Sequence, residues 1–221
     1  MILGISGKKQ AGKTTIANIF HGAVLKKNGM VQDYNVNENG KLIIKTVNNQ
    51  GKEGWGEFDV ERKDEQFIEY AHYNMWPYVK LYNFQNMKLM QKMPIDAKKS
   101  WKWRKGKMTA REFMQFFGTD IMRKIHPNVW ANACINKITR EGSGLAIIAD
   151  VRFPNEVEAI NKAGGKVLRL ERDVHEDSHD SETALDADNY DHSKFWHVLN
   201  NREMTIQDTI TEVKSLLEKI E

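Results

Sequence analysis

The residues with the clearest chemical potential are Gly7–Thr14, which read Gly-Lys-Lys-Gln-Ala-Gly-Lys-Thr. They match the pattern G-x-x-x-x-G-K-[ST], in which backbone N–H groups curl around phosphate oxygens at the start of a helix. In such a loop Lys13 reaches the β- and γ-phosphates of a nucleotide, and the Thr14 hydroxyl ligates Mg²⁺. The context supports this interpretation, because the apolar run 2–6 precedes the loop and an amphipathic helical pattern follows it. A glycine-rich turn that binds nothing is the alternative.

A second candidate site follows the apolar run 145–149, which leads into Asp150. A carboxylate at the end of a buried strand is typical of the position that helps to hold the Mg²⁺ of a bound nucleotide. Arg152 lies two residues further on, where a guanidinium would stabilise charge on a transferring phosphoryl group. The alternative is that Asp150 only caps the next turn.

A third candidate site lies on a helix that the capping box Thr109–Glu112 predicts. At 100° per residue, one stripe of this helix carries a guanidinium, an amide, a bare backbone and a hydroxyl: Arg111, Gln115, Gly118 and Thr119. These groups suit a phosphorylated substrate with a polar base. An ordinary solvated helix face is the alternative.

The elements that would position these sites alternate between short apolar runs and helical patterns, which predicts an α/β fold around a mainly parallel sheet. We expect strands at 2–6, 78–82, 145–149, 167–170 and 196–199, and helices at 14–28, from 109, after Pro127, at 155–163 and from Thr205. Residues 30–76 differ, because they are rich in Asn, Gly and Lys. Their Asn39-Gly40 pair predicts a turn and therefore a hairpin insertion.

The composition excludes several classes of protein. The chain has 221 residues, one cysteine and a formal net charge of +3, which fits a single large domain without disulfides. No run approaches the roughly 20 apolar residues of a membrane-spanning helix. The N-terminus lacks the basic and apolar regions of a secretory signal. We therefore expect a cytoplasmic protein in which Cys134 is a core residue.

Taken together, the motifs resemble the deoxynucleoside monophosphate kinases of bacteriophages. The resemblance rests on Gly7–Thr14, Arg111-x-x-x-Gln115-x-x-Gly118-Thr119-Asp120 with Trp130 beyond, Asp150-Val-Arg152 with Asn155-Glu156, Ser181-Glu182, and Asn200-Asn201 between a strand and a helix. It implies a three-layer P-loop kinase fold, with a mainly parallel five-stranded sheet, helices on both faces and a lid. Residues 1–221 would form one domain, with an insertion at 30–76 and the lid at about 172–192.

The resemblance also implies an activity, in which ATP donates its γ-phosphoryl group to a deoxynucleoside monophosphate and Mg²⁺ assists. The catalytic residues would be Lys13, Arg152 and Asp150, with Thr14 and Asp150 at the metal. ATP would be bound by Gly7, Ala11, Gly12, Lys13, Thr14, Thr15, Arg172 and Asn200. The acceptor nucleotide would be bound by Arg111, Gln115, Gly118, Thr119, Trp130 and Arg152. The resemblance further suggests a homodimer, and it leaves the accepted bases open.

Two other functions remain open at this point. One is another small-metabolite kinase with a phosphate loop, similar to dephospho-coenzyme A kinase. The other is an ATPase stimulated by nucleic acid, because residues 98–107 carry six positive charges interleaved with Trp101 and Trp103. We do not expect direct nucleic-acid binding, since a basic segment also attracts free nucleotides. His175 and His179 have a spacing compatible with a metal site, but no apolar scaffold surrounds them in the sequence.

Overall fold

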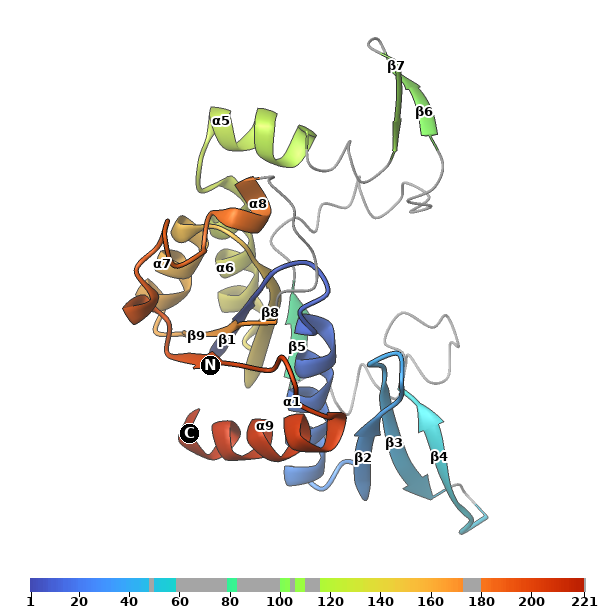
Figure 1. Ribbon diagram of the computed structural model, residues 1–221. Helices are drawn as coiled ribbons and strands as arrows, with labels where there is room; N and C mark the ends of the chain where they lie inside the picture. Colours follow the sequence, from blue (N-terminus) through green and yellow to red (C-terminus); the bar gives the residue numbers. More distant parts are fainter. Residues whose placement is uncertain are drawn as a thin grey trace.

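A parallel sheet forms the centre of the protein (Figure 1). The computed structural model describes residues 1–47, 50–58, 79–82, 100–103, 106–109, 116–172 and 180–220. Five strands make the sheet: β1 (Ile2–Ser6), β5 (Val79–Tyr82), β8 (Leu145–Val151), β9 (Lys166–Leu170) and β10 (His197–Leu199). Their order is β10-β9-β1-β8-β5, and every neighbouring pair is parallel. The predicted α/β class with a parallel sheet is confirmed.

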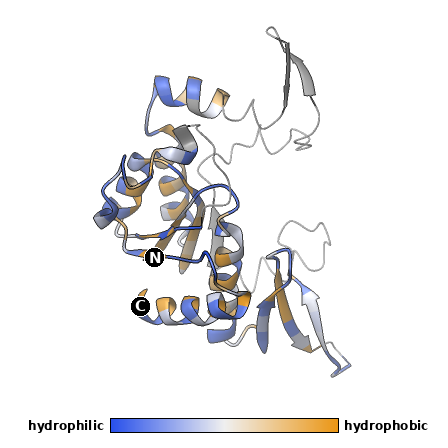
Figure 2. Cartoon of the chain, in the orientation of Figure 1, coloured by the Kyte–Doolittle hydropathy of each residue, from blue (hydrophilic) through white to orange (hydrophobic). Residues whose placement is uncertain are grey.

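Helices cover both faces of this sheet. Helices α1 (Lys13–Lys27) and α9 (Ile206–Ile220) bury their apolar residues in one core, together with Leu3 and Ile5 of β1. Helices α6 (Val129–Glu141) and α7 (Pro154–Lys162) form a second core on the opposite face. Figure 2 shows the apolar colouring of the strands between these two layers. Strand β1 is buried along its whole length, which explains its uninterrupted apolar sequence.

The N-terminal half also contains an antiparallel sheet of β2 (Asp33–Val36), β3 (Leu42–Val47) and β4 (Glu53–Glu57). It packs against α1, where a Cβ added to Gly22 would lie 2.4 Å from the ring of Tyr34. The turn between β2 and β3 contains Gly40, whose φ of 73° lies in the left-handed region that favours glycine. This sheet falls within the predicted insertion at 30–76.

The segment that begins at Thr109 differs from the sequence prediction, and the basic run 98–107 before it forms an element that was not predicted. The basic run contributes most of a β-hairpin, in which β6 (Ser100–Trp103) pairs with β7 (Gly106–Thr109). Thr109 therefore ends a strand. Among the described residues, the first helix after this strand is the π-helix η2 (Phe116–Met122), and α5 (Arg123–Ile125) follows it. A π-helix has i→i+5 hydrogen bonds, so the spacing of 100° per residue is wrong for this part of the predicted helix.

Short elements complete the described chain. Helix α8 (Asp180–Thr183) and the 3₁₀ helix η3 (His192–Lys194) lie between β9 and β10 in the sequence. Cys134 is buried, as predicted, and burial raises the pKa of its thiol to about 12. Among the helices that the structure describes, none combines the length and the apolar character needed to cross a membrane.

Candidate active site

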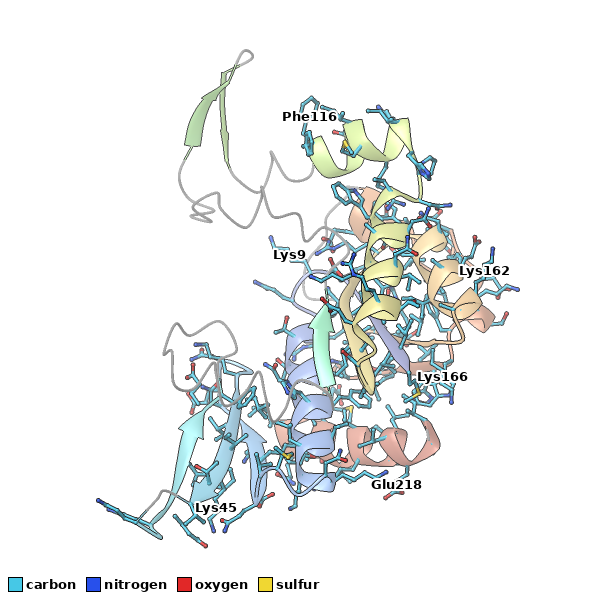
Figure 3. All side chains as sticks on the ribbon, turned by 180° about the vertical axis from the view of Figure 1, so that it is seen from behind. Lys9, Lys45, Phe116, Lys162, Lys166 and Glu218 are labelled. Carbon is cyan, nitrogen blue, oxygen red and sulfur yellow. The ribbon has the colours of Figure 1, made fainter. Side chains whose placement is uncertain are left out.

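The candidate residues gather where the parallel strands end. The phosphate loop follows β1. Asp150 is the second-to-last residue of β8, and Arg152 comes directly after that strand. Arg172 comes shortly after β9, and Asn200 comes directly after β10. Parallel strands bring these ends to one edge of the sheet, which is where ligands bind in open α/β sheets. In Figure 3 the labelled Phe116 of η2 is at the top of the view and Lys9 of this loop lies below it, while Lys45 and Glu218 are at the bottom.

Glycine and a buried amide shape the phosphate loop. Gly12 precedes α1 with a φ of 90°, in the left-handed region that side chains rarely adopt. The Ala11 backbone N–H donates to the Lys8 carbonyl at 3.1 Å, which closes the turn. The Ala11 carbonyl accepts a hydrogen bond from Asn201 Nδ2 at 2.9 Å, and Asn201 is only 5% exposed. Asn201, which comes directly after Asn200, therefore holds the loop in place although it lies 190 positions later in the sequence.

Lys13 is held by the loop itself. Its ammonium group donates to the carbonyl oxygens of Gly7 and Lys8, each at 2.7 Å. Both acceptors are neutral, so an anionic phosphate would be a stronger partner for the same cation. Lys13 begins α1, which points the positive end of the helix dipole at the same place.

Several charges surround the Lys13 ammonium group. Burial, and then the nearby Arg152, lower the pKa of Lys13 to about 8, against the opposing charges of Glu182 and Asp150. The charges of Arg152, Glu182 and Asp150 therefore act on Lys13 although these residues come from different elements. A bound phosphate would add negative charge and favour the protonated lysine.

Glu182 of α8 contacts both sides of the site and is only 5% exposed. Its Oε1 forms an ion pair with Nη1 of Arg152, and its Oε2 accepts a hydrogen bond from the backbone N–H of Lys9 at 2.7 Å. A guanidinium and a phosphate-loop amide are both typical donors to phosphate. The Glu182 carboxylate therefore occupies a position suited to an anion.

Glu156 lies behind this site and is 2% exposed. Its Oε2 accepts hydrogen bonds from the backbone N–H groups of Arg152 and Phe153, at 2.8 and 3.0 Å. Its Oε1 forms an ion pair with Arg123 Nη1 at 3.0 Å. Burial raises the pKa of Glu156 to about 7, although the backbone donors and Arg123 oppose that shift.

The predicted acceptor residues are described in part. Trp130 is buried, and its Nε1–H donates to the Gly118 carbonyl at 2.9 Å, so the indole supports the backbone of η2. Thr119 follows Gly118 in the same π-helix. Single turns of π-helix often mark functional sites. Arg111 and Gln115 lie outside the described residues.

The donors proposed for Mg²⁺ fit that ion chemically. Thr14 is exposed in the first turn of α1, and the half-buried Asp150 lies near the end of β8. Mg²⁺ usually takes one or two protein oxygens and completes its shell with water and substrate phosphates. In the described part of the chain no three His, Cys, Asp or Glu residues are grouped as a metal site. His175 and His179 are outside that part.

A pocket of about 590 Å³ lies beside the end of β10. It is lined by Asn200, Arg202, Glu203, Met204 and Asp208. Arg172 is exposed at the end of the neighbouring strand β9, and Thr15 is half-buried in the first turn of α1. The predicted ATP residues are therefore spread from the phosphate loop to this pocket.

Sequence reasoning gave no role to several residues of the site. One is Arg169, which is 6% exposed in β9. Its guanidinium donates to Ser6 Oγ at 3.1 Å and pairs with Asp186 at 3.1 Å, while Asp186 also pairs with Lys8 of the loop. An arginine within an apolar strand signals such a network, because a buried charge needs partners. Asn201, Glu182 and Glu156 belong to the motifs on which the family resemblance rests, but the sequence assigned no role to them.

Comparison with known proteins places these observations in one context. The sequence model of a family described as "Deoxynucleotide monophosphate kinase" matches residues 1–210 of the chain. A protein of Acanthamoeba polyphaga mimivirus, named "Putative deoxynucleotide monophosphate kinase", is 29% identical over 91 residues. That match covers 35% of this chain and 47% of the viral protein, which is about half of its length. The family match includes every strand of the parallel sheet and the whole candidate site.

Proposed function

Because the chain belongs to the deoxynucleotide monophosphate kinase family, we propose that it transfers the γ-phosphoryl group of ATP to a deoxynucleoside monophosphate. The products would be ADP and a deoxynucleoside diphosphate. One observation carries the proposal within the family: Lys13, Arg152 and the phosphate-loop amides converge at the carboxyl edge of the sheet. Phosphoryl transfer depends mainly on positioning and charge stabilisation, which these groups supply.

On the donor side, the phosphates of ATP would replace the present hydrogen-bond partners of the loop, because a phosphate is a stronger acceptor. Lys13 would leave the carbonyls of Gly7 and Lys8 for phosphate oxygens. The Lys9 amide and the Arg152 guanidinium would leave Glu182. Bound Mg²⁺, held by Thr14 and Asp150, would neutralise charge on the β- and γ-phosphates. The adenine and ribose would extend toward Arg172 and Asn200.

On the acceptor side, the deoxynucleoside monophosphate would lie against η2 and the predicted stripe of Arg111 and Gln115. Gly118 and Thr119 are part of η2, and Trp130 supports its backbone. Arg152 would contact the transferring group between donor and acceptor. Asp150 either accepts the proton of the acceptor or serves only the metal. We place the reaction in the cytoplasm, which would be that of a bacterial host if a phage encodes the chain.

The direct test is an acceptor panel. The purified protein is incubated with Mg²⁺, ATP and each of the four common deoxynucleoside monophosphates, and nucleotides are separated by chromatography. We expect ADP and one deoxynucleoside diphosphate to form in equal amounts. Lys13→Met should lower the rate at least about a thousandfold, because it removes a charge that stabilises the transition state, and should leave the circular dichroism spectrum unchanged. Absence of diphosphate with every acceptor would overturn the proposal.

A further inference from the structure

A buried carboxylate joins two segments that the proposed function places on different sides of the acceptor. Glu156 accepts the backbone N–H groups of Arg152 and Phe153 with one oxygen and pairs with Arg123 through the other. All three partners are donors, and the Glu156 side chain is 3% exposed. The carboxylate thus has a defined orientation, with each oxygen committed to a different segment.

The contacts on the Arg123 side are equally specific. The guanidinium lies 3.8 Å from the centre of the Phe153 ring, and its Nη2 donates to Asn155 Oδ1 at 2.5 Å. Asn155 in turn donates to the Pro127 carbonyl at 3.0 Å and to Asn128 Oδ1 at 2.7 Å. A stacked guanidinium that also binds acceptors on two residues has little freedom to move.

The position of Arg123 gives this network its functional meaning. Arg123 directly follows η2, the π-helix that contains Gly118 and Thr119. Glu156 therefore connects the end of the acceptor segment to the backbone of Arg152, whose side chain reaches the phosphate loop through Glu182. Nothing in this network requires Glu156 to touch a substrate.

We propose that Glu156 is a positioning residue that sets the placement of η2 relative to Arg152, and so aligns the acceptor with the transferring phosphoryl group. The proposal rests on the proposed kinase function. Transfer requires the reacting atoms to be placed closely, and a misplacement of about 1 Å can cost about 100-fold in rate. The effect should appear in acceptor kinetics, because the phosphate loop has no direct contact with Glu156 among the described residues.

The test compares Glu156→Gln with Glu158→Gln. The assays are run at pH 8, where Glu156 is mostly ionised because its pKa is about 7. Glutamine keeps the size and an acceptor oxygen but removes the charge that pairs with Arg123. Glu158 lies on the same helix and is exposed, so its variant is the matched control. We expect Glu156→Gln to raise the KM for the deoxynucleoside monophosphate about tenfold and to lower kcat about tenfold, with the KM for ATP within about twofold of the wild type. The control should behave as wild type.

A second variant guards against simple loss of folding. Arg123 is more exposed than Glu156, so a change there disturbs the core less. Arg123→Lys keeps the positive charge but loses the planar geometry that stacks on Phe153. Arg123→Lys should also raise the KM for the acceptor. In the double variant, the fold-increase in this KM should be smaller than the product of the increases in the two single variants. A lowered melting temperature with unchanged acceptor KM in both variants would overturn the positioning role. If the wild type phosphorylates no acceptor, the proposed function fails instead.

Discussion

At the scale of single residues, the site already binds an anion made by its own chain. Arg152 and the Lys9 amide hold the Glu182 carboxylate, and Lys13 is held by two carbonyl oxygens. These contacts satisfy groups that would otherwise be buried without partners. Under the proposed function, ATP would have to displace Glu182 before its phosphates could reach the same donors.

This competition predicts the effect of Glu182→Gln. The neutral amide would be a weaker partner for Arg152 and Lys9 than the carboxylate, by about 1 kcal/mol. We expect the KM for ATP to fall about fivefold, as measured by initial rates at saturating acceptor. Asp188→Asn, an exposed change in the segment after α8, should leave this KM unchanged. A higher KM for ATP in Glu182→Gln would show that the carboxylate assists ATP binding instead.

The raised pKa of Glu156 predicts a second effect, on stability. The pKa is about 7 in the folded protein against an ordinary value of 4.5, so folding favours the protonated acid. The stabilisation from this group is complete below pH 4.5 and is lost as the pH rises through about 7. In urea unfolding from pH 5 to pH 8, the wild type should therefore lose stability relative to Glu156→Gln. If the difference in free energy of unfolding between the wild type and Glu156→Gln stays constant with pH, the raised pKa of Glu156 is contradicted.

At the scale of elements, the antiparallel sheet supports the helix that carries the phosphate loop. A Cβ on Gly40 would lie 2.2 Å from Thr15 Oγ1 and 3.1 Å from Thr15 Cβ. The Gly40 carbonyl also accepts from Asn18 Nδ2 at 2.8 Å. The turn between β2 and β3 therefore rests against the first turns of α1, just after the residues proposed to hold phosphate.

Gly40→Ala tests this contact, with Gly51→Ala as its control. Both glycines have a positive φ, 73° and 76°, so both variants lose about 1–2 kcal/mol to backbone strain. Only Gly40 faces a neighbour, because a Cβ at Gly51 would have nothing within 4 Å. We expect the free energy of unfolding, measured with urea, to fall by at least about 1 kcal/mol more in Gly40→Ala than in Gly51→Ala. The reason is that overpacking a filled site typically costs this much. Equal losses would show that the turn does not depend on its contact with Thr15.

The sequence predicts these elements and sites unequally, for physical reasons. The strands of the central sheet and the helices packed on it were predicted to within a few residues, because hydrophobic periodicity is a local signal. The phosphate-loop motif is equally easy to recognise because Gly7–Thr14 are contiguous, and its role in binding phosphate stays a prediction. The π-helix η2 was not predicted, because α-helical spacing was assumed and the side chains carry no signal for i→i+5 hydrogen bonds. The pairing of Arg152 with Glu182, 30 positions apart, depends on tertiary structure and leaves no mark in local spacing.

At the scale of the whole molecule, the site is assembled from distant parts of the chain. Strand β1 lies between β8 and β9, and Asn201 donates to Ala11 across 190 positions. In contrast, among the described strands those of the β6–β7 hairpin and of the β2–β4 sheet pair only with strands that are adjacent in sequence. The local sheets can form early, whereas the edge with the candidate site requires strands that begin at Ile2 and end at Leu199.

The central place of β1 has a consequence for the protein while it is being made. The ribosome synthesises Ile2–Ser6 well before the partner strand β8, which ends at Val151. At about 5–20 residues per second, this apolar strand waits about 7–30 seconds without either neighbour. During that interval its exposed edges are free to pair with other nascent chains. Rapid expression should therefore favour aggregation, and slower synthesis or a chaperone that binds apolar segments should increase the soluble yield.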